Sequence, residues 1–235
     1  MTLSPDPWAG GGLPSLNVAA TCTATKALGP GVRAVVWVQG CPLNCHGCVA
    51  PAWIPPQIAR LVPPEQLADE LLARPEITGL TFSGGEPMLQ AAGLARLIRY
   101  ARHTRPLSLI CFTGLRLEQL HARPPGPGVA ELLAEVDLLI DGPYVAAQDD
   151  NRGMRGSANQ RVIHLTGRIP PDSYNFIDDE RQAEIHVAGG EALLVGVPAN
   201  GLAAAFERAV QKARVTTIAE LAHRGPTPST KRSLL

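Results

Sequence analysis

Three of the five cysteines in this chain lie close together, at Cys41, Cys45 and Cys48, in the spacing C-x3-C-x2-C. Thiolates are soft ligands that select zinc or iron–sulfur clusters. Cysteines this closely spaced on one loop can surround a cubane cluster, and the backbone N–H groups of the loop can offset its negative charge. The spacing therefore indicates an iron–sulfur cluster first, a zinc ion second, and unreactive thiols last.

This segment has no fourth thiolate. A structural zinc ion needs four protein ligands. The one nearby candidate, His46, lies between two of the cysteines, where closing a tetrahedron would strain the loop. In a four-iron cluster, three cysteines leave one iron without a protein ligand. We therefore expect that iron to be available to a further molecule.

The loops that carry candidate functional residues all follow predicted strands. Apolar runs and helically spaced leucines predict strands at 33–39, 77–82, 107–113 and 136–141, with helices at 64–73 and 89–103. Strands that alternate with helices imply a parallel sheet whose functional loops share one edge. The loops expected at that edge are the cysteine segment, residues 83–87 (SGGEP), Thr113-Gly114 and Asp141-Gly142.

The last third of the chain has a different pattern. It predicts strands at 160–166, 184–187 and 192–197, a hairpin turn at Gly189-Gly190 and a helix at 202–213. We expect an α/β protein in four parts. These are a lead segment (1–28), a core domain (29–169), a small α+β extension (170–222) and a disordered tail (223–235).

Composition excludes several classes of protein. The 21 basic and 21 acidic residues cancel, which disfavours a basic nucleic-acid binder and a polybasic membrane anchor. Five cysteines are an odd number, so a secreted disulfide framework fits poorly. We find no signal peptide and no apolar run near the roughly 20 residues that span a bilayer. These features predict a cytoplasmic protein with reduced thiols.

Two motifs in order resemble the radical S-adenosylmethionine (SAM) superfamily: the cysteine spacing after one strand and SGGEP after the next. Within it, the chain resembles the activating proteins of anaerobic ribonucleoside-triphosphate reductases, which are glycyl radical enzyme activases. This narrower likeness runs from about Gly29 to Thr166 and includes DLLIDG at 137–142 and RGSANQ at 155–160. The chain departs from the pattern at Gly47, where most superfamily members carry an aromatic residue, and in the extension beyond Pro170.

The resemblance implies a fold, cofactors and partners. The fold would be a partial (β/α) barrel, with a [4Fe-4S] cluster on the three cysteines and SAM on the open iron. Reductive cleavage of SAM would give a 5′-deoxyadenosyl radical that takes hydrogen from a glycine of a partner enzyme. The implied partners are an anaerobic ribonucleotide reductase-like glycyl radical enzyme and a flavodoxin- or ferredoxin-type electron donor, with no nucleic acid and no membrane. The implied SAM-binding residues are Gly47, Val49, Ser83, Gly84, Gly85, Glu86, Thr113 and Asp141.

Four of these residues have a more specific implied role, and two of them, Glu86 and Asp141, also have a plainer interpretation. Gly84 and Gly85 would let the backbone approach SAM closely, and Glu86 would hold its amino-group end or anchor the turn. Asp141 would orient a ligand or cap a turn. Cys22 and Cys111 fit buried small apolar residues better than ligands.

Three polar loop residues carry weaker predictions. His46 fits a solvent-facing loop position. Arg155 and Asn159 would bind SAM or the partner, although solvated loop residues would look the same.

Two other functions stay open from the sequence. One is a stand-alone radical SAM enzyme that modifies a small molecule or peptide, with the extension as a lid over its substrate. The other is a non-catalytic iron–sulfur or zinc module, which a fourth protein ligand would favour.

Overall fold

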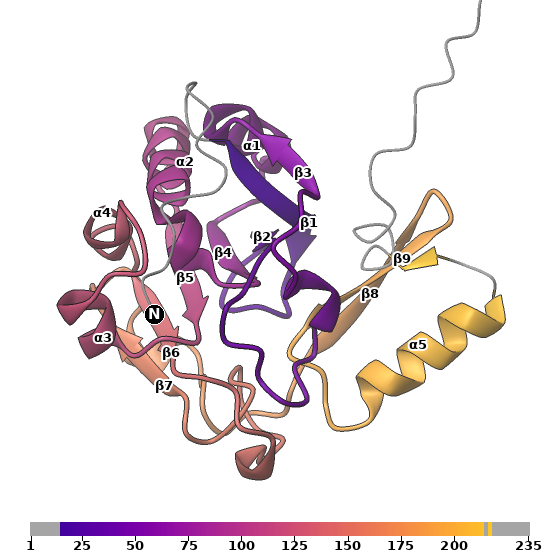
Figure 1. Ribbon diagram of the computed structural model, residues 1–235. Coiled ribbons are helices and arrows are strands. Elements are labelled where there is room, and N and C mark those ends of the chain that lie inside the picture. The colour runs from indigo at the N-terminus through magenta and orange to yellow at the C-terminus, as the bar shows by residue number, and fades with distance from the viewer. Residues whose placement is uncertain (1–14, 214–215, 218–235) are drawn as a thin grey trace, which may run out of the picture.

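The computed structural model describes residues 15–213 and 216–217, and its elements are arranged as Figure 1 shows. The predicted tail, 223–235, lies outside the described residues, as does the first half of the predicted lead segment, 1–14. The strands are β1 (Leu16–Thr25), β2 (Arg33–Val38), β3 (Arg60–Val62), β4 (Gly79–Gly84), β5 (Ser108–Thr113), β6 (Leu138–Asp141), β7 (Arg161–His164), β8 (Ala183–Ala188), β9 (Glu191–Gly196) and β10 (Thr216–Thr217). The helices are α1 (Pro64–Leu71), α2 (Ala91–Thr104), α3 (Leu117–Ala122), α4 (Val129–Leu133) and α5 (Leu202–Ala213), with short 3-10 turns that include η1 (Pro51–Trp53) and η2 (Pro87–Gln90).

Seven strands form the main sheet, in the order β3-β1-β2-β4-β5-β6-β7. The four central strands, β2, β4, β5 and β6, are parallel, as predicted. The strands β1, β3 and β7 pair antiparallel, so the sheet as a whole is mixed. Among the described strands, β3 and β7 do not pair with each other, and the sheet stays open.

Strand β1 was not predicted from the sequence. It pairs with β2 from Val18 opposite Val38 to Thr25 opposite Arg33. Its apolar side chains alternate, with Leu16, Val18, Ala20 and Cys22 all buried. That alternation is a strand signal, but the residues are small and follow a segment rich in Pro and Gly. The second half of the predicted lead segment is therefore part of the main sheet.

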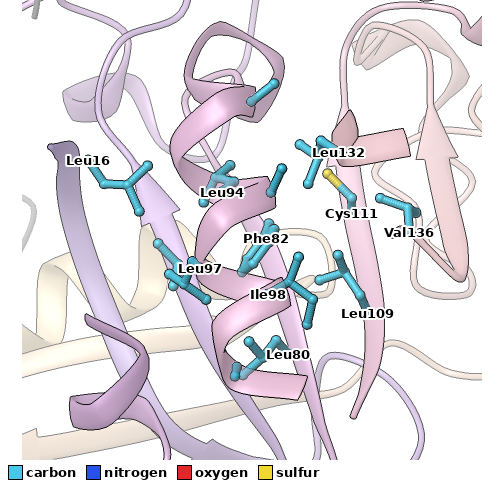
Figure 2. Packing of buried hydrophobic residues seen from close by; sticks show 14 of the residues in the cluster. Leu16, Leu80, Phe82, Leu94, Leu97, Ile98, Leu109, Cys111, Leu132 and Val136 are labelled. Carbon is cyan, nitrogen blue, oxygen red and sulfur yellow. The ribbon is translucent and has the colours of Figure 1, made fainter. Parts of the chain in front are cut away.

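The two faces of the sheet bury different partners. Along β2, Ala34, Val36 and Val38 point to the helical side, while Val35 and Trp37 point to the opposite side. Successive residues of a strand point to opposite faces, and both faces of β2 are buried. The sequence of β2 is therefore one continuous apolar run. Figure 2 shows α2 packed over the first face, with Leu94, Leu97 and Ile98 set against β4 and β5.

The segment beyond Pro170 covers part of the second face. Leu193 and Val195 of β9 lie in one apolar cluster with Val35 and Trp37 of β2. The hairpin of β8 and β9 turns at Gly189 and Gly190, as predicted, and their φ angles of 60° and 80° suit such a turn. Figure 1 shows this hairpin and α5 on the side of the molecule away from α2 and α4. The predicted extension thus shares a core with the main sheet, while its exact boundaries stay a prediction.

The described helices are short. The longest, α2, has 14 residues. Within the described part of the chain, none is long and apolar enough to cross a bilayer.

Two valines of the β8–β9 hairpin test this shared core. Val195 is 0% exposed and Val187 is 67% exposed, although both belong to the same small sheet. We expect Val195→Ala to lower the free energy of unfolding by about 2 kcal/mol, because it leaves a cavity against β2. Val187→Ala should change it by less than about 0.5 kcal/mol. Chemical denaturation measures both, and equal effects of the two substitutions would contradict the packing described above.

Candidate metal centre

The cysteine loop begins where β2 ends and is held at its base by η1. The Gly40 N–H donates to the Trp53 carbonyl at 2.8 Å, and the Cys41 N–H donates to the Ile54 carbonyl at 2.9 Å. Within the loop, the Cys48 N–H donates to the Cys45 carbonyl at 3.2 Å. All three thiols are free and partly buried. The loop is therefore a folded unit with fixed ends.

A residue in the left-handed conformation precedes each of the three cysteines. Gly40, Asn44 and Gly47 have φ angles of 98°, 46° and 75°. Glycine adopts positive φ freely, and asparagine is the side chain that tolerates it best. Each thiol is therefore preceded by a backbone conformation that most side chains disfavour. The spacing of the cysteines is thus matched by the spacing of the turns.

Backbone N–H groups of the loop lie close to two of the three sulfur atoms, those of Cys41 and Cys48. Burial raises the pKa of the Cys41 thiol to about 11, and the backbone N–H groups of Leu43 and Asn44 oppose that rise. Burial also raises the pKa of the Cys48 thiol, against a backbone N–H from Ala50. Backbone donors to cysteine sulfur suit an iron–sulfur site, since they stabilise the charge of the thiolates.

The donor set fits a cluster better than a single ion. Within the described residues, no three His, Cys, Asp or Glu side chains are placed to hold one metal ion. In a cubane cluster the three sulfurs bind three different irons, so they need not converge on one point. Cys45 lies near enough for its negative charge to raise the pKa of both other thiols, so the three thiols lie near one another.

The four loops that the sequence places at one edge do meet there. The Gly85 N–H donates to the Val38 carbonyl at 2.7 Å, and the Glu86 N–H donates to the Gly40 carbonyl at 2.9 Å. A Cβ on Gly114, after β5, would lie 2.1 Å from Leu43 Cδ1 of the cysteine loop. From the loop after β6, Tyr144 and Ala146 lie against Gly47.

The structure shows a reason for glycine at positions 84 and 85 that differs from the expected one. A Cβ on Gly84 would lie 2.4 Å from the Val38 nitrogen, and one on Gly85 would lie 2.2 Å from the Gly40 carbonyl oxygen. The missing side chains therefore make room for the end of β2 and the base of the cysteine loop. The missing side chains were expected to leave space for SAM, but backbone atoms of Val38 and Gly40 lie where the Cβ atoms would be.

Glu86 anchors the turn after β4. Its side chain is 1% exposed and accepts hydrogen bonds from the Met88 N–H, the Thr113 hydroxyl and the Gly114 N–H at 3.0, 2.8 and 2.9 Å. Burial raises the pKa of this carboxyl, and the three donors counter that rise. Glu86 and Thr113 together join the turn to the end of β5.

Asp141 is fully buried and its carboxylate is held by the protein. It accepts hydrogen bonds from the Leu117 N–H at 2.8 Å and from Arg161 Nε at 2.8 Å, and it also pairs with Arg116. It therefore fixes the start of α3 and the strand β7. Ser83 lies at the end of β4, opposite Trp37 of β2.

The remaining predicted residues separate into buried and exposed ones. Cys22 and Cys111 are buried, as expected, and Figure 2 shows the Cys111 sulfur beside α2, among apolar side chains that include Leu132. His46 is exposed, and so is Val49, at 61%. Arg155 bonds within its own loop, to Asp150 and to the Ala158 carbonyl.

Sequence comparison identifies the family of this site. The profile of the 4Fe-4S single cluster domain matches residues 27–163, a range that holds the cysteine loop and all of β2 to β6. The chain belongs to this family.

Known relatives of the chain agree with the resemblance seen in the motifs. The chain is 32% identical over 146 residues to the anaerobic ribonucleoside-triphosphate reductase-activating protein of Vibrio cholerae, covering 58% of this chain and 89% of that protein. The protein of the same name from Enterobacteria phage T4 is 31% identical over 147 residues, covering 60% and 89%. The pyruvate formate-lyase-activating enzyme of Staphylococcus aureus is 37% identical over 152 residues, covering 60% and 58%. The resemblance to radical SAM activating proteins is thus confirmed.

The family site contains residues that motif reasoning missed. Asn44 supplies a left-handed turn, Leu43 packs on Gly114, and Tyr144 lies against Gly47. Asn in a loop between two cysteines is a sequence signal for such a turn. The contacts of Leu43 and Tyr144 join distant segments and leave no local signal.

Asn44 gives a direct test of the loop geometry. We expect Asn44→Gly to load iron like the unaltered chain, because glycine adopts the φ of 46° without strain. Asn44→Val should lower the loaded fraction severalfold, because a β-branched residue resists this conformation by roughly 1–2 kcal/mol. Iron and sulfide content after anaerobic reconstitution measures the effect. Equal loading of the two variants would contradict a role for the left-handed turn.

Proposed function

We propose that this chain is a radical SAM enzyme that cleaves SAM reductively at a [4Fe-4S] cluster and installs a glycyl radical on a partner enzyme. One observation carries the proposal. Cys41, Cys45 and Cys48 share one eight-residue loop, with Cys45 near both of the others, whereas Cys22 and Cys111 are buried in separate apolar clusters. The protein thus offers three thiolates to a four-iron cluster, and one iron is left for SAM.

The residues of the chain have distinct tasks in this proposal. When bound, the cluster and SAM supply one-electron chemistry that the side chains cannot provide. Cys41, Cys45 and Cys48 hold the cluster, and the N–H groups of the loop stabilise its charge. The parallel strands hold the loop against the SGGEP turn, which orients SAM beside it.

The eight proposed SAM-binding residues fall into two groups. Gly47 and Val49 are exposed, and Ser83, Gly84 and Gly85 are partly exposed, so these five are available to contact SAM. Glu86, Thr113 and Asp141 are at most 3% exposed. We assign Glu86 and Thr113 to shaping the turn, because protein donors already occupy their oxygens. Asp141 would act in the same way from the end of β6.

The partner follows from the relatives. Proteins named for activating anaerobic ribonucleoside-triphosphate reductase match 58–60% of this chain. The family match at residues 27–163 includes the whole site. We infer a reductase of that type as the protein substrate and a flavodoxin- or ferredoxin-type protein as electron donor. The open sheet would be the partial barrel of the radical SAM fold. We place the protein in the cytoplasm, where thiols stay reduced.

Cys45→Ala and Cys111→Ala form a matched pair for the cluster chemistry. We expect Cys45→Ala to lose the cluster signal and at least about 99% of 5′-deoxyadenosine formation, since a ligand is gone. Cys111→Ala should keep both, because its sulfur lies in the core beside α2. Anaerobic reconstitution, reduction with dithionite and chromatography of the SAM products measure this. Undiminished 5′-deoxyadenosine in Cys45→Ala would exclude the radical SAM assignment.

A second experiment separates the activase from a stand-alone enzyme. The reconstituted chain, SAM and a reductant are incubated with an anaerobic ribonucleotide reductase, and with a variant whose radical-bearing glycine is replaced by alanine. We expect a glycyl doublet in the EPR spectrum only with the unaltered reductase. Production of 5′-deoxyadenosine with no doublet on any such reductase would favour a small-molecule or peptide substrate instead.

A further inference from the structure

The segment beyond Pro170 reaches the cysteine loop through three side chains. Arg181 precedes β8, and its side chain is 3% exposed. Its Nη2 donates to Asp149 Oδ1 at 2.7 Å, and the Tyr144 hydroxyl donates to Asp149 Oδ2 at 3.2 Å. The Tyr144 ring then lies against the loop, since a Cβ on Gly47 would be 3.5 Å from Tyr144 Cε1. These contacts form one continuous path from the extension to the residue before Cys48.

Arg181 is held on several sides at once. Beside Asp149, it donates to the carbonyls of Arg155 and Gly156 at 3.1 and 2.9 Å and to the Pro198 carbonyl at 3.2 Å. Its Nε is buried and has no hydrogen-bond partner in the described structure. A guanidinium fixed by so many protein acceptors has one geometry, and it transmits that geometry to Asp149.

Tyr144 is fixed in turn. Its ring lies between Gly47 and Gly156, and a Cβ on Gly156 would lie 3.0 Å from Tyr144 Cδ2. Burial and the negative charge of Asp149 raise the pKa of the phenol, so it stays protonated and donates to that carboxylate at neutral pH. The small residues at 47 and 156 let the ring enter between the two loops.

We propose that the extension beyond Pro170 positions the cysteine loop: Arg181 holds Asp149, Asp149 holds the Tyr144 hydroxyl, and the Tyr144 ring supports the loop at Gly47. Tyr144, Asp149 and Arg181 are positioning residues in this scheme. The inference rests on the proposed function in one respect only, that the cysteine loop holds a [4Fe-4S] cluster.

Arg181→Met and Tyr144→Phe test the path, with Arg102→Met as control. Arg102 of α2 also forms a largely buried ion pair, with Asp137. Asp137 comes just before β6, so this pair lies at the opposite end of the sheet from the cysteine loop. The first measurement is hydrogen exchange at the Cys41 and Cys48 amides in the metal-free full-length chain. We expect roughly tenfold faster exchange in Arg181→Met, and a severalfold increase in Tyr144→Phe, which keeps the ring but loses the hydroxyl. Arg102→Met should leave both amides unchanged.

The second measurement is the EPR spectrum of the reduced cluster in the reconstituted chains. A changed spectrum in Arg181→Met and Tyr144→Phe, but not in Arg102→Met, supports the proposal. If the first two variants are destabilised like the control while exchange and spectrum stay unchanged, the proposal is wrong.

Two further outcomes remain decisive. If Arg181→Met does not fold, Tyr144→Phe decides alone, and unaltered exchange in it overturns the path. If the unaltered chain forms no cluster, the proposed function fails, while the exchange data still support or overturn the positioning role.

Discussion

The close contact between the ends of β2 and β4 is the constraint on which the site depends. The two strands are in parallel register up to Val38 and Gly84. Their pairing then continues past the strand ends, as the Gly85 and Glu86 N–H groups donate to the Val38 and Gly40 carbonyls. The cysteine loop and the SGGEP turn are thereby fixed to each other by backbone alone. Glycine at 84 and 85 is required because any Cβ there would meet that backbone.

Buried charged groups organise both ends of the central strands, by different means. At the carboxyl ends, the Glu86 carboxylate is held by uncharged donors and Asp141 by two arginines. At the amino ends, Asp137 pairs with Arg102 and Arg168. Arg33 is also fully buried there, and burial lowers its pKa to about 9. A buried charge needs several well-placed partners, and each such group therefore ties neighbouring strands together.

Apolar packing on the second face of the sheet also supports the cysteine loop. The apolar cluster of β9 with β2 also contains Trp53 of η1, whose carbonyl accepts the Gly40 N–H at the base of the cysteine loop. The same extension sends Arg181 to the loop after β6. Residues added beyond the matched family range thus contact the site from two directions. This arrangement gives the extension a structural role that its sequence did not reveal.

The sequence by itself determined the chemistry of this protein. The types and spacing of Cys41, Cys45 and Cys48, the SGGEP motif and the alternation of strands with helices are local patterns, and local patterns can be read without the fold. They placed four loops at one edge correctly. The tertiary structure alone decided what holds those loops: β1 beside β2, the close packing at Gly84, and Tyr144 against Gly47. Such contacts join residues far apart in the chain, and they arise only when both faces of the sheet are packed.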